Sequence, residues 1–544
     1  MPSQRKNRTI LLLEYAGVLA GFLLMYLFVV PQMDVFLLAR YVDDTLQGAI
    51  DFSLYYGNGR LLGNILGVYF SNHFVFSTMI IAAVLTAMVF FLNHILADNN
   101  PYTVFVFALM IAFPSIGFVQ KCYSAFASFA NFVIPLAFWL ASVHVCTKLV
   151  KPNCTLTQPK RTILTIVGCL CAAAACLFSE NTTIFAVVAA LAMLVYFYAG
   201  KQQGHSTYLW AQLAAVAVGA MVMFLLPVVT GTSGNLSGYR QITTELTELI
   251  TNVVFSYALF ADIFNHLHIM LLVFSFAMVL LLCKQTRKNP FLTNLQIGIF
   301  AAYPMLCLLM NQMDSHSVLS YVTLLKLADA ALVAVYAVNI ILTVILIEDK
   351  TLRLQCILMS AVVVLSVAPM MIVTASGNRT YYTTFIGMTM FAVVVIRQTL
   401  PDVFDRMIKT AEFRKVTLGI SAGCFALLSA MLLLLGLYNY DFYVMRCDAM
   451  AEAFRAGQEQ GITVIQKAPT MPFLPSSIES HDENVLFLAF DENSRVDTEV
   501  IALTAWEYFE YYRNEIVKNP IQALRFAFEN WEYKEAEYPD SLLR

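Results

Sequence analysis

Charged residues are scarce in this chain of 544 residues, since Asp, Glu, Lys and Arg together make up only 13% of it. A soluble domain usually contains about 25% of these residues. Hydrophobic residues make up 59% of the chain, and the mean hydropathy is +0.70. This composition excludes an ordinary soluble protein and predicts a polytopic membrane protein.

Several motifs that carry chemistry are also missing. The 11 cysteines form no CxxC motif and no Cys/His metal spacing, and most of them lie in apolar runs, where cysteine behaves as a small hydrophobic residue. No basic run with interleaved aromatic residues occurs, so we expect no nucleic-acid partner. No nucleotide-binding signature occurs between the apolar runs either.

Apolar runs divide most of the chain, and each is close to the roughly 20 residues needed to cross a bilayer. We therefore predict a polytopic α-helical membrane protein with about thirteen transmembrane helices. The first run is too long for the apolar core of a signal peptide, so we expect it to stay in the protein as the first span. The runs cover residues 10–31, 73–96, 102–119, 125–147, 162–178, 182–199, 207–230, 263–283, 292–312, 326–347, 354–375, 380–396 and 416–438.

The distribution of Lys and Arg predicts the orientation of these spans. If the N-terminus is cytoplasmic and the spans alternate, the inner segments hold 18 of the cations before residue 441 and the outer segments hold 6. Cytoplasmic loops normally carry the excess of Lys and Arg. We therefore predict a cytoplasmic N-terminus and an extracytoplasmic C-terminus.

The C-terminal segment 441–544 differs from the rest of the chain in charge. It holds 9 Lys and Arg against 19 Asp and Glu, a net charge of −10, whereas residues 1–440 have a net charge of +7. Short strand-like runs at 462–465 and 485–490 lie among helix-like stretches. We predict two domains, a transmembrane domain at 1–440 and a small extracytoplasmic α/β module at 441–544.

Polar residues concentrate in the stretch 41–72, directly after the first span. Asp43 and Asp44 are adjacent, and helical spacing places Asp51 on the same face as Asp44. The segment Tyr56-Gly57-Asn58-Gly59-Arg60 contains two glycines that permit a tight turn presenting Arg60. Carboxylates followed by a presented cation could deprotonate a hydroxyl and hold a phosphate. The structural alternative is a solvated loop with a capping Asp and a turn.

Other polar groups also fall on the predicted outer side. Each has a structural explanation of its own: a lysine that reaches for the interface, a carboxylate at a helix start, a plain connecting loop, or an intrahelical ion pair. Taken together they place the protein's chemistry on the outer face. These groups are Lys121, Glu180, Tyr239, Arg240, Arg379 and the pair Lys326 and Asp329.

Two short motifs resemble those of a known enzyme class. Tyr41-Val42-Asp43-Asp44 and Tyr56-Gly57-Asn58-Gly59-Arg60 are similar to motifs of the GT-C class of membrane glycosyltransferases, and in particular of the bacterial GtrII-like glucosyltransferase group. The resemblance implies a GT-C-like fold with a catalytic first outer loop at 32–72, in a bacterial cytoplasmic (inner) membrane. The family often has an Arg soon after the Asp pair, whereas Gln47 and Gly48 occupy that region here.

The resemblance implies transfer of a sugar from a polyprenyl-phosphate-linked donor to a cell-surface glycan or glycopolymer acceptor. We expect Asp44 to be the general base, with Asp43 as its substitute or as a group that positions the acceptor. The donor phosphate would be bound by Arg60, Arg240, Arg379 and Lys121. The acceptor, or the cations themselves, would be oriented by Asp51, Tyr56, Asn58, Glu180 and Tyr239.

The cofactor and the function class leave alternatives open. A divalent cation, Mg²⁺ or Mn²⁺, on Asp43 and Asp44 is one option, and catalysis by positioning and protein cations alone explains the pattern equally well. A lipid-linked sugar flippase or transporter, a polysaccharide polymerase or ligase, and a membrane scaffold presenting the acidic tail are the rival functions. Membrane lipids are expected partners in every case.

Overall fold

The structure is a computed structural model, and its described part is a bundle of α-helices. It describes residues 2–28, 45–56, 60–71, 74–112, 114, 119–123, 126–152, 156–225, 256–284, 290–313, 319–372, 378–401 and 410–460. Within these ranges every regular element is helical, and no strand occurs. The strands predicted at 462–465 and 485–490 lie outside the described ranges, so the α/β module stays a prediction.

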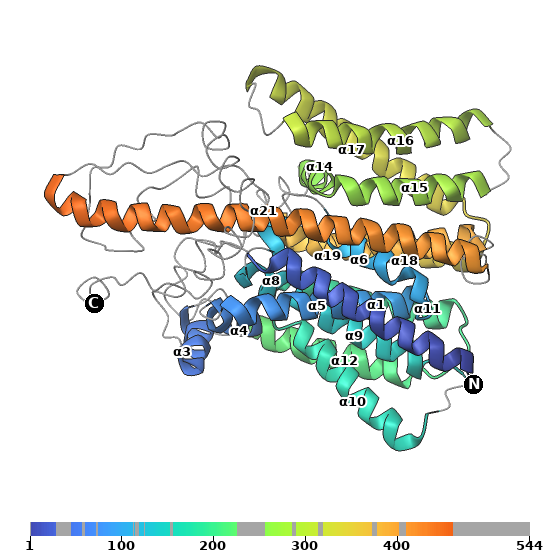
Figure 1. Ribbon diagram of the computed structural model, residues 1–544. Helices are drawn as coiled ribbons and strands as arrows, with labels where there is room; N and C mark the ends of the chain where they lie inside the picture. The colour runs from blue at the N-terminus through green and yellow to red at the C-terminus, as the bar shows by residue number, and fades with distance from the viewer. Residues whose placement is uncertain are drawn as a thin grey trace.

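The helices pack into a bundle of long rods with short helical turns at one end (Figure 1). α1 lies against α5 and α21, α9 lies against α5 and α10, and α11 lies between α12 and α18. α14 to α17 form a group that joins the rest through α15 and α19. The first elements are α1 (Pro2–Tyr26), α3 (Leu46–Asp51), η1 (Phe52–Tyr56), α4 (Leu61–Ser71), α5 (Phe74–Leu96), η2 (Pro101–Thr103), α6 (Val104–Ala112), η3 (Val119–Tyr123), α8 (Phe126–Phe132) and α9 (Ile134–Leu149). The remaining elements are α10 (Gln158–Ala175), α11 (Glu180–Ala199), α12 (Thr207–Leu225), α14 (Ser256–His266), α15 (His268–Lys284), α16 (Pro290–Met313), α17 (Leu319–Ile345), α18 (Lys350–Ile372), η5 (Asn378–Tyr381), α19 (Tyr382–Thr399) and α21 (Ala411–Gln460).

The helices confirm a polytopic helical membrane protein. Each predicted apolar run overlaps at least one helix, and 8 helices among the described residues are long and apolar enough to cross a membrane. The count becomes 9 if α14 and α15, which meet at a bend of 94°, form one broken span. The number thirteen stays a prediction, because α6, α10 and α19 fall short of the length or hydropathy required, and the side chains of α17 are described over only part of that helix.

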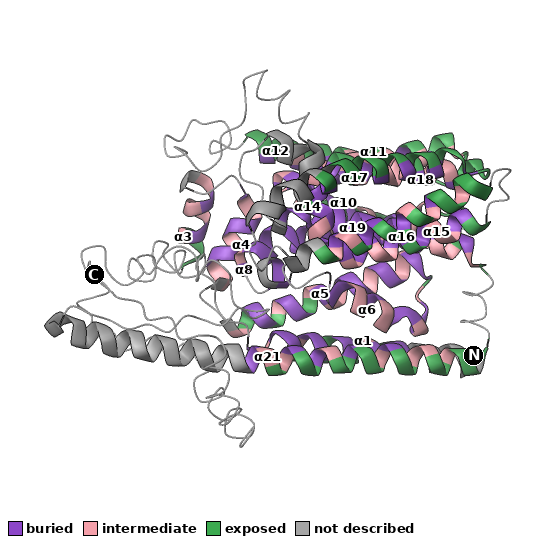
Figure 2. Cartoon of the chain, turned by 90° about the horizontal axis from the view of Figure 1, so that it is seen from above, coloured by how far each residue is buried: buried purple, intermediate pink, exposed green. Residues whose placement is uncertain are grey.

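Large apolar side chains cover the outside of the bundle. Leu12 on α1, Leu170 on α10, Met221 on α12 and Leu427 on α21 are each at least 60% exposed. Figure 2 shows the exposed positions along the outward faces of α1 and α21, with buried positions turned towards the other helices. A water-soluble protein does not expose apolar surface on this scale, so the faces fit a hydrocarbon environment.

The two ends of the bundle differ, and the N-terminus lies at one of them (Figure 1). At this N-terminal end, Arg397 donates to Asp98 and to the carbonyl of Leu96, and Lys284 Nζ donates to the carbonyl of Gln398 at 2.7 Å. These groups come from segments predicted to lie on the inner side. α3 lies at the opposite end, which the predicted orientation makes extracytoplasmic.

The predicted domain boundary at residue 440 lies inside a helix. α21 runs for 50 residues from Ala411 to Gln460 without a break, and its last part extends beyond the other helices (Figure 1). The last predicted span, 416–438, and the helix-like stretch that follows it therefore form one rod. Both stretches are apolar or strong helix formers, and neither Pro nor Gly interrupts residues 437–456.

Glu14 on α1 is a buried carboxylate within the first span. It is 5% exposed, and neither carboxylate oxygen has a hydrogen-bond partner in the described part of the chain. A buried polar group without a partner costs about 1–3 kcal/mol. We expect Glu14→Met to raise the free energy of unfolding by about that amount in detergent unfolding experiments. The control is Glu412→Met, at an exposed position, which should change the free energy of unfolding little. If Glu14→Met were less stable than wild type, the carboxylate would have a stabilising partner.

Candidate functional site

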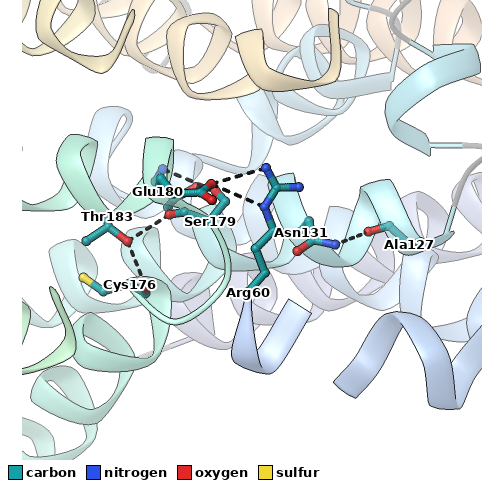
Figure 3. Close-up of polar contacts among 8 residues, drawn as sticks. Arg60, Ala127, Asn131, Cys176, Ser179, Glu180 and Thr183 are labelled. Carbon is teal, nitrogen blue, oxygen red and sulfur yellow. Dashed lines mark hydrogen bonds and ion pairs between the residues drawn. The ribbon is translucent and has the colours of Figure 1, made fainter. Parts of the chain in front are cut away.

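Arg60 is fixed at the start of α4, at the end of the bundle opposite the N-terminus. Its carbonyl accepts from the backbone N–H of Asn64 at 2.8 Å, which closes the first turn of the helix. The backbone N–H of Leu62 donates to the carbonyl of Leu177 at 3.0 Å, so the start of α4 is tied to the connection between α10 and α11. The chain thus places the Arg60 side chain beside the first residue of α11 (Figure 3).

That first residue is Glu180, and it forms an ion pair with Arg60. The Arg60 Nη2 and Nε atoms lie 3.3 Å and 3.4 Å from Glu180 Oε2. The two side chains are 5% and 21% exposed. The Arg60 guanidinium also stacks over the Phe132 ring, with Cζ at 4.8 Å from the ring centroid. Ion pair and stacking together hold the plane of the guanidinium in one orientation.

The connection that carries Glu180 is held by its own hydroxyl groups. Ser179 Oγ accepts from the backbone N–H of Thr182 at 3.4 Å and caps α11. Thr183 Oγ1 donates to the carbonyls of Cys176, at 2.7 Å, and Ser179, at 2.8 Å. The cap of α11 is therefore Ser179, and Glu180 adds a carboxylate at the positive end of the helix dipole.

Close packing of α4 on α8 sets the position of Arg60. A Cβ atom on Gly63 would lie 2.1 Å from Asn131 Oδ1 and 3.2 Å from the carbonyl oxygen of Phe178. Asn131 is itself held in place, because its Nδ2 donates to the carbonyl of Ala127 at 2.8 Å (Figure 3). Only a residue without a Cβ allows this approach.

We therefore expect Gly63→Ala to displace α4 and to lower the free energy of unfolding by about 1–3 kcal/mol through overpacking. Gly67→Ala is a matched control on the same helix, since its Cβ would meet Ala127 Cα at 3.4 Å, an ordinary contact. Thermal unfolding of both variants in detergent checks this expectation. Equal stability of the two variants would show that the Gly63 contact relaxes without cost.

Elements that carry two more predicted cations meet at the same end of the bundle. Lys121 lies in η3 and Arg379 lies in η5, and η3, η5 and α8 contact one another. α8 also packs against α4, so the backbone brings the chain positions of Arg60, Lys121 and Arg379 around one helix. The side chains of Lys121, Arg379 and Tyr56 are outside what the structure describes.

The other predicted residues divide into one that is described and five that are not. Asp51 lies at the end of α3 and is half-exposed. Gln47 Nε2 donates to Asp51 Oδ1 at 2.9 Å. Asp43, Asp44, Asn58, Tyr239 and Arg240 lie outside the described residues. No group of three His, Cys, Asp or Glu that could hold a metal ion occurs within the described ranges, which do not include Asp43 and Asp44.

The structure adds a polar cluster that the sequence did not suggest. Tyr381 Oη, on η5, donates to Asp262 Oδ2 on α14 at 2.5 Å. His266, one turn further along α14, places its Nδ1 at 3.4 Å from Asp262 Oδ1. Asp262 and His266 have the i, i+4 spacing that places two residues on one face of a helix. This spacing could have indicated the pair, but the two residues lie at the edge of the predicted span 263–283, which hides it.

Asp329 has two partners on other helices. It is 2% exposed, and it accepts from Asn265 Nδ2 at 2.8 Å and from Tyr303 Oη at 3.2 Å. These donors come from α14 and α16, so Asp329 links helices instead of being only one half of an intrahelical pair with Lys326. The Lys326 side chain lies outside the described residues.

No family model, no curated protein and no solved structure matches this chain.

Proposed function

We propose that this protein is a glycosyltransferase that moves a sugar from a polyprenyl-phosphate-linked donor to a surface glycan acceptor at the end of the bundle opposite the N-terminus. The observation that carries the proposal is the buried Arg60, paired with Glu180 and stacked on Phe132. A guanidinium held in this way is suited to a phosphate, because its N–H groups match phosphate oxygens in a planar fork. The nearby positions of Lys121 and Arg379 add positive charge at the same end.

The reaction needs a base and cations. In the proposed step Asp44 takes the proton of the acceptor hydroxyl, and the hydroxyl oxygen forms a bond to the anomeric carbon of the donor sugar. The bond between that carbon and the phosphate oxygen breaks, and polyprenyl phosphate leaves with the electron pair. Arg60 stabilises the charge that develops on the leaving phosphate, and Glu180 keeps the guanidinium oriented.

Single-turnover sugar transfer tests the proposal. The purified full chain in nanodiscs is mixed with radiolabelled polyprenyl-phosphate hexose and crude surface glycan, with and without EDTA. Appearance of label in the glycan supports the proposal, and the EDTA arm decides between Mg²⁺ or Mn²⁺ and catalysis by protein cations alone. Addition of several sugars in succession would indicate a polymerase, and absence of transfer with every donor tried would overturn the enzyme proposal.

A transport function is the second candidate, because of one specific arrangement. α14 and α15 form a helix pair bent by 94°, and Asn265, next to the break, binds the buried Asp329. Broken helices and buried carboxylates are recurrent features of substrate sites in transporters. Movement of lipid-linked sugar across sealed liposomes, lost in Asp329→Asn and accompanied by no transfer to glycan, would favour this candidate.

A further inference from the structure

A large apolar cavity lies in the half of the bundle near the N-terminal end. Its volume is about 600 Å³, within the range of roughly 300–1,000 Å³ that is usual for small-molecule sites. α9, α11, α18 and α19 form its walls. Almost all of the wall is apolar, from residues such as Val143, Ala189, Met359 and Met390. A polar or charged ligand would find few partners in such a cavity.

Aromatic rings bound the cavity on the side of Arg60 and Glu180. Among the lining residues of α9, Trp139 lies nearest to Arg60 and Glu180, and among those of α11 it is Phe185. The two rings meet edge to face, with 6.3 Å between their centroids. Both side chains are only 2% exposed. None of the lining residues belongs to the candidate site for sugar transfer, so the cavity is separate from that site.

The mouth of the cavity is polar and carries positive charge. Lys151, Gln202 and Gln203 line it, and all three are exposed. The two loops that hold them are joined, because the backbone N–H of His205 donates to the carbonyl of Val150 at 3.1 Å. Gly204 makes this approach possible, since it has a φ of +147° and a Cβ there would meet the Val150 carbonyl oxygen at 1.9 Å.

The charges around the mouth favour an anion. Lys201 lies in one of these two loops, Lys148 lies in the last turn of α9 just before the other, and both are exposed. Asp349, an acidic group, lies beside the lining residue Tyr196. Its Oδ1 accepts from the backbone N–H groups of Thr351 and Leu352, at 2.8 Å and 3.3 Å, so this carboxylate acts as the cap of α18.

We propose that the cavity binds one acyl chain of an anionic glycerophospholipid, with its phosphate at Lys151. The apolar walls suit a hydrocarbon chain, which carries no polar group that would be left without a partner inside the cavity. The cationic mouth lies where the headgroups of the leaflet at the N-terminal end would be, and a Lys or Arg at a lipid surface attracts anionic headgroups. This lipid site does not depend on the proposed sugar transfer.

Tryptophan quenching by brominated lipid tests the proposal, because Trp139 lines the cavity. The segment Phe126–Leu149 is 83% buried, against 22–44% in the other candidate spans, so Trp139 is remote from bulk lipid. The chain has 4 Trp residues, and Trp210→Phe, Trp506→Phe and Trp531→Phe leave Trp139 alone. The protein is placed in phosphatidylcholine vesicles that contain a minor fraction of phosphatidylglycerol, with bromine on the acyl chains of one lipid or the other.

We expect brominated phosphatidylglycerol to quench Trp139 several-fold more strongly than brominated phosphatidylcholine at the same mole fraction. A protein that keeps only Trp210, which is 52% exposed, should be quenched equally by both lipids. Ala189→Phe fills the cavity and should abolish quenching of Trp139, whereas Leu191→Phe, on the lipid-facing side of the same helix, should leave it unchanged. Lys151→Gln should remove the preference for phosphatidylglycerol, and Lys160→Gln on α10 should not.

Two results would overturn the proposal. If Trp139 is not quenched by either lipid while the Trp210 protein is, no acyl chain enters the cavity. If Trp139 is quenched equally by both lipids, or if Ala189→Phe leaves the quenching unchanged with the thermal unfolding temperature intact, the cavity is not an anionic-lipid site.

Discussion

Replacing Arg60 by methionine is expected to abolish sugar transfer and to lower the free energy of unfolding by about 3–5 kcal/mol, the usual cost of breaking a buried ion pair by removing one partner. The loss of stability follows because Glu180 keeps its charge at a 21% exposed position without Arg60. The loss of transfer follows because the leaving phosphate loses its planar cation. Unfolding in detergent and single-turnover transfer measure the two effects.

The double variant separates the structural role of Arg60 from its chemical role. Replacing a buried ion pair by apolar residues of similar size is often neutral for stability. Arg60→Met with Glu180→Met should therefore recover most of the lost stability and none of the transfer. Arg60→Lys keeps the charge but loses the fork and the stacking on Phe132, so it should transfer slowly. If the double variant transfers as fast as wild type, the ion pair is purely structural.

Asp44→Asn is expected to slow sugar transfer by about 10²–10⁴-fold while leaving binding of the donor intact, because a general base contributes a factor of that size. The amide has nearly the shape of the carboxylate but cannot accept the acceptor's proton. The exposed Glu412→Gln, at the N-terminal end of the bundle, is the control for loss of a carboxylate. Single-turnover transfer and equilibrium binding of polyprenyl-phosphate hexose are compared in the two variants.

The outcome at Asp44 decides between the two members of the Asp pair. If Asp44→Asn transfers at the wild-type rate, Asp44 is not the base, and Asp43→Asn and Glu180→Gln identify the group that is. If both single Asp variants retain part of the activity and the double variant loses all of it, each carboxylate substitutes for the other.

The sequence was sufficient to predict a bundle of apolar helices, and it predicted Arg60 and Glu180 for the same end of that bundle, where the structure brings them together. It singled out Arg60 because two glycines permit a turn that presents it, and Glu180 because it lies in the short connection between two apolar runs. Their contact joins residues 120 positions apart through the packing of α4 on the α10–α11 connection, and no local pattern encodes such a distance. The same limit applies to Asp329, whose partners Asn265 and Tyr303 lie on other helices.

Local sequence also failed where a helix breaks without a marker. Residues 263–283 read as one span, yet α14 and α15 meet at 94° around Leu267. Pro and Gly are the usual marks of such a break, and residues 256–287 contain neither. Because of the bend, Asp262 and His266 lie on a helix that is steeply inclined to α15. In this position Asp262 accepts a hydrogen bond from Tyr381.

The side of the membrane on which sugar is transferred can be measured directly. Full-length protein is reconstituted in sealed vesicles with polyprenyl-phosphate hexose in the bilayer, and a membrane-impermeant acceptor is supplied on one side only. Protease access to an N-terminal tag reports which end of each molecule faces that side. If transfer takes place at the end opposite the N-terminus, product will form only from molecules whose N-terminus faces away from the acceptor. Product from molecules of the other orientation, or movement of the lipid-linked hexose across the bilayer with no product, would contradict the proposed transfer at that end.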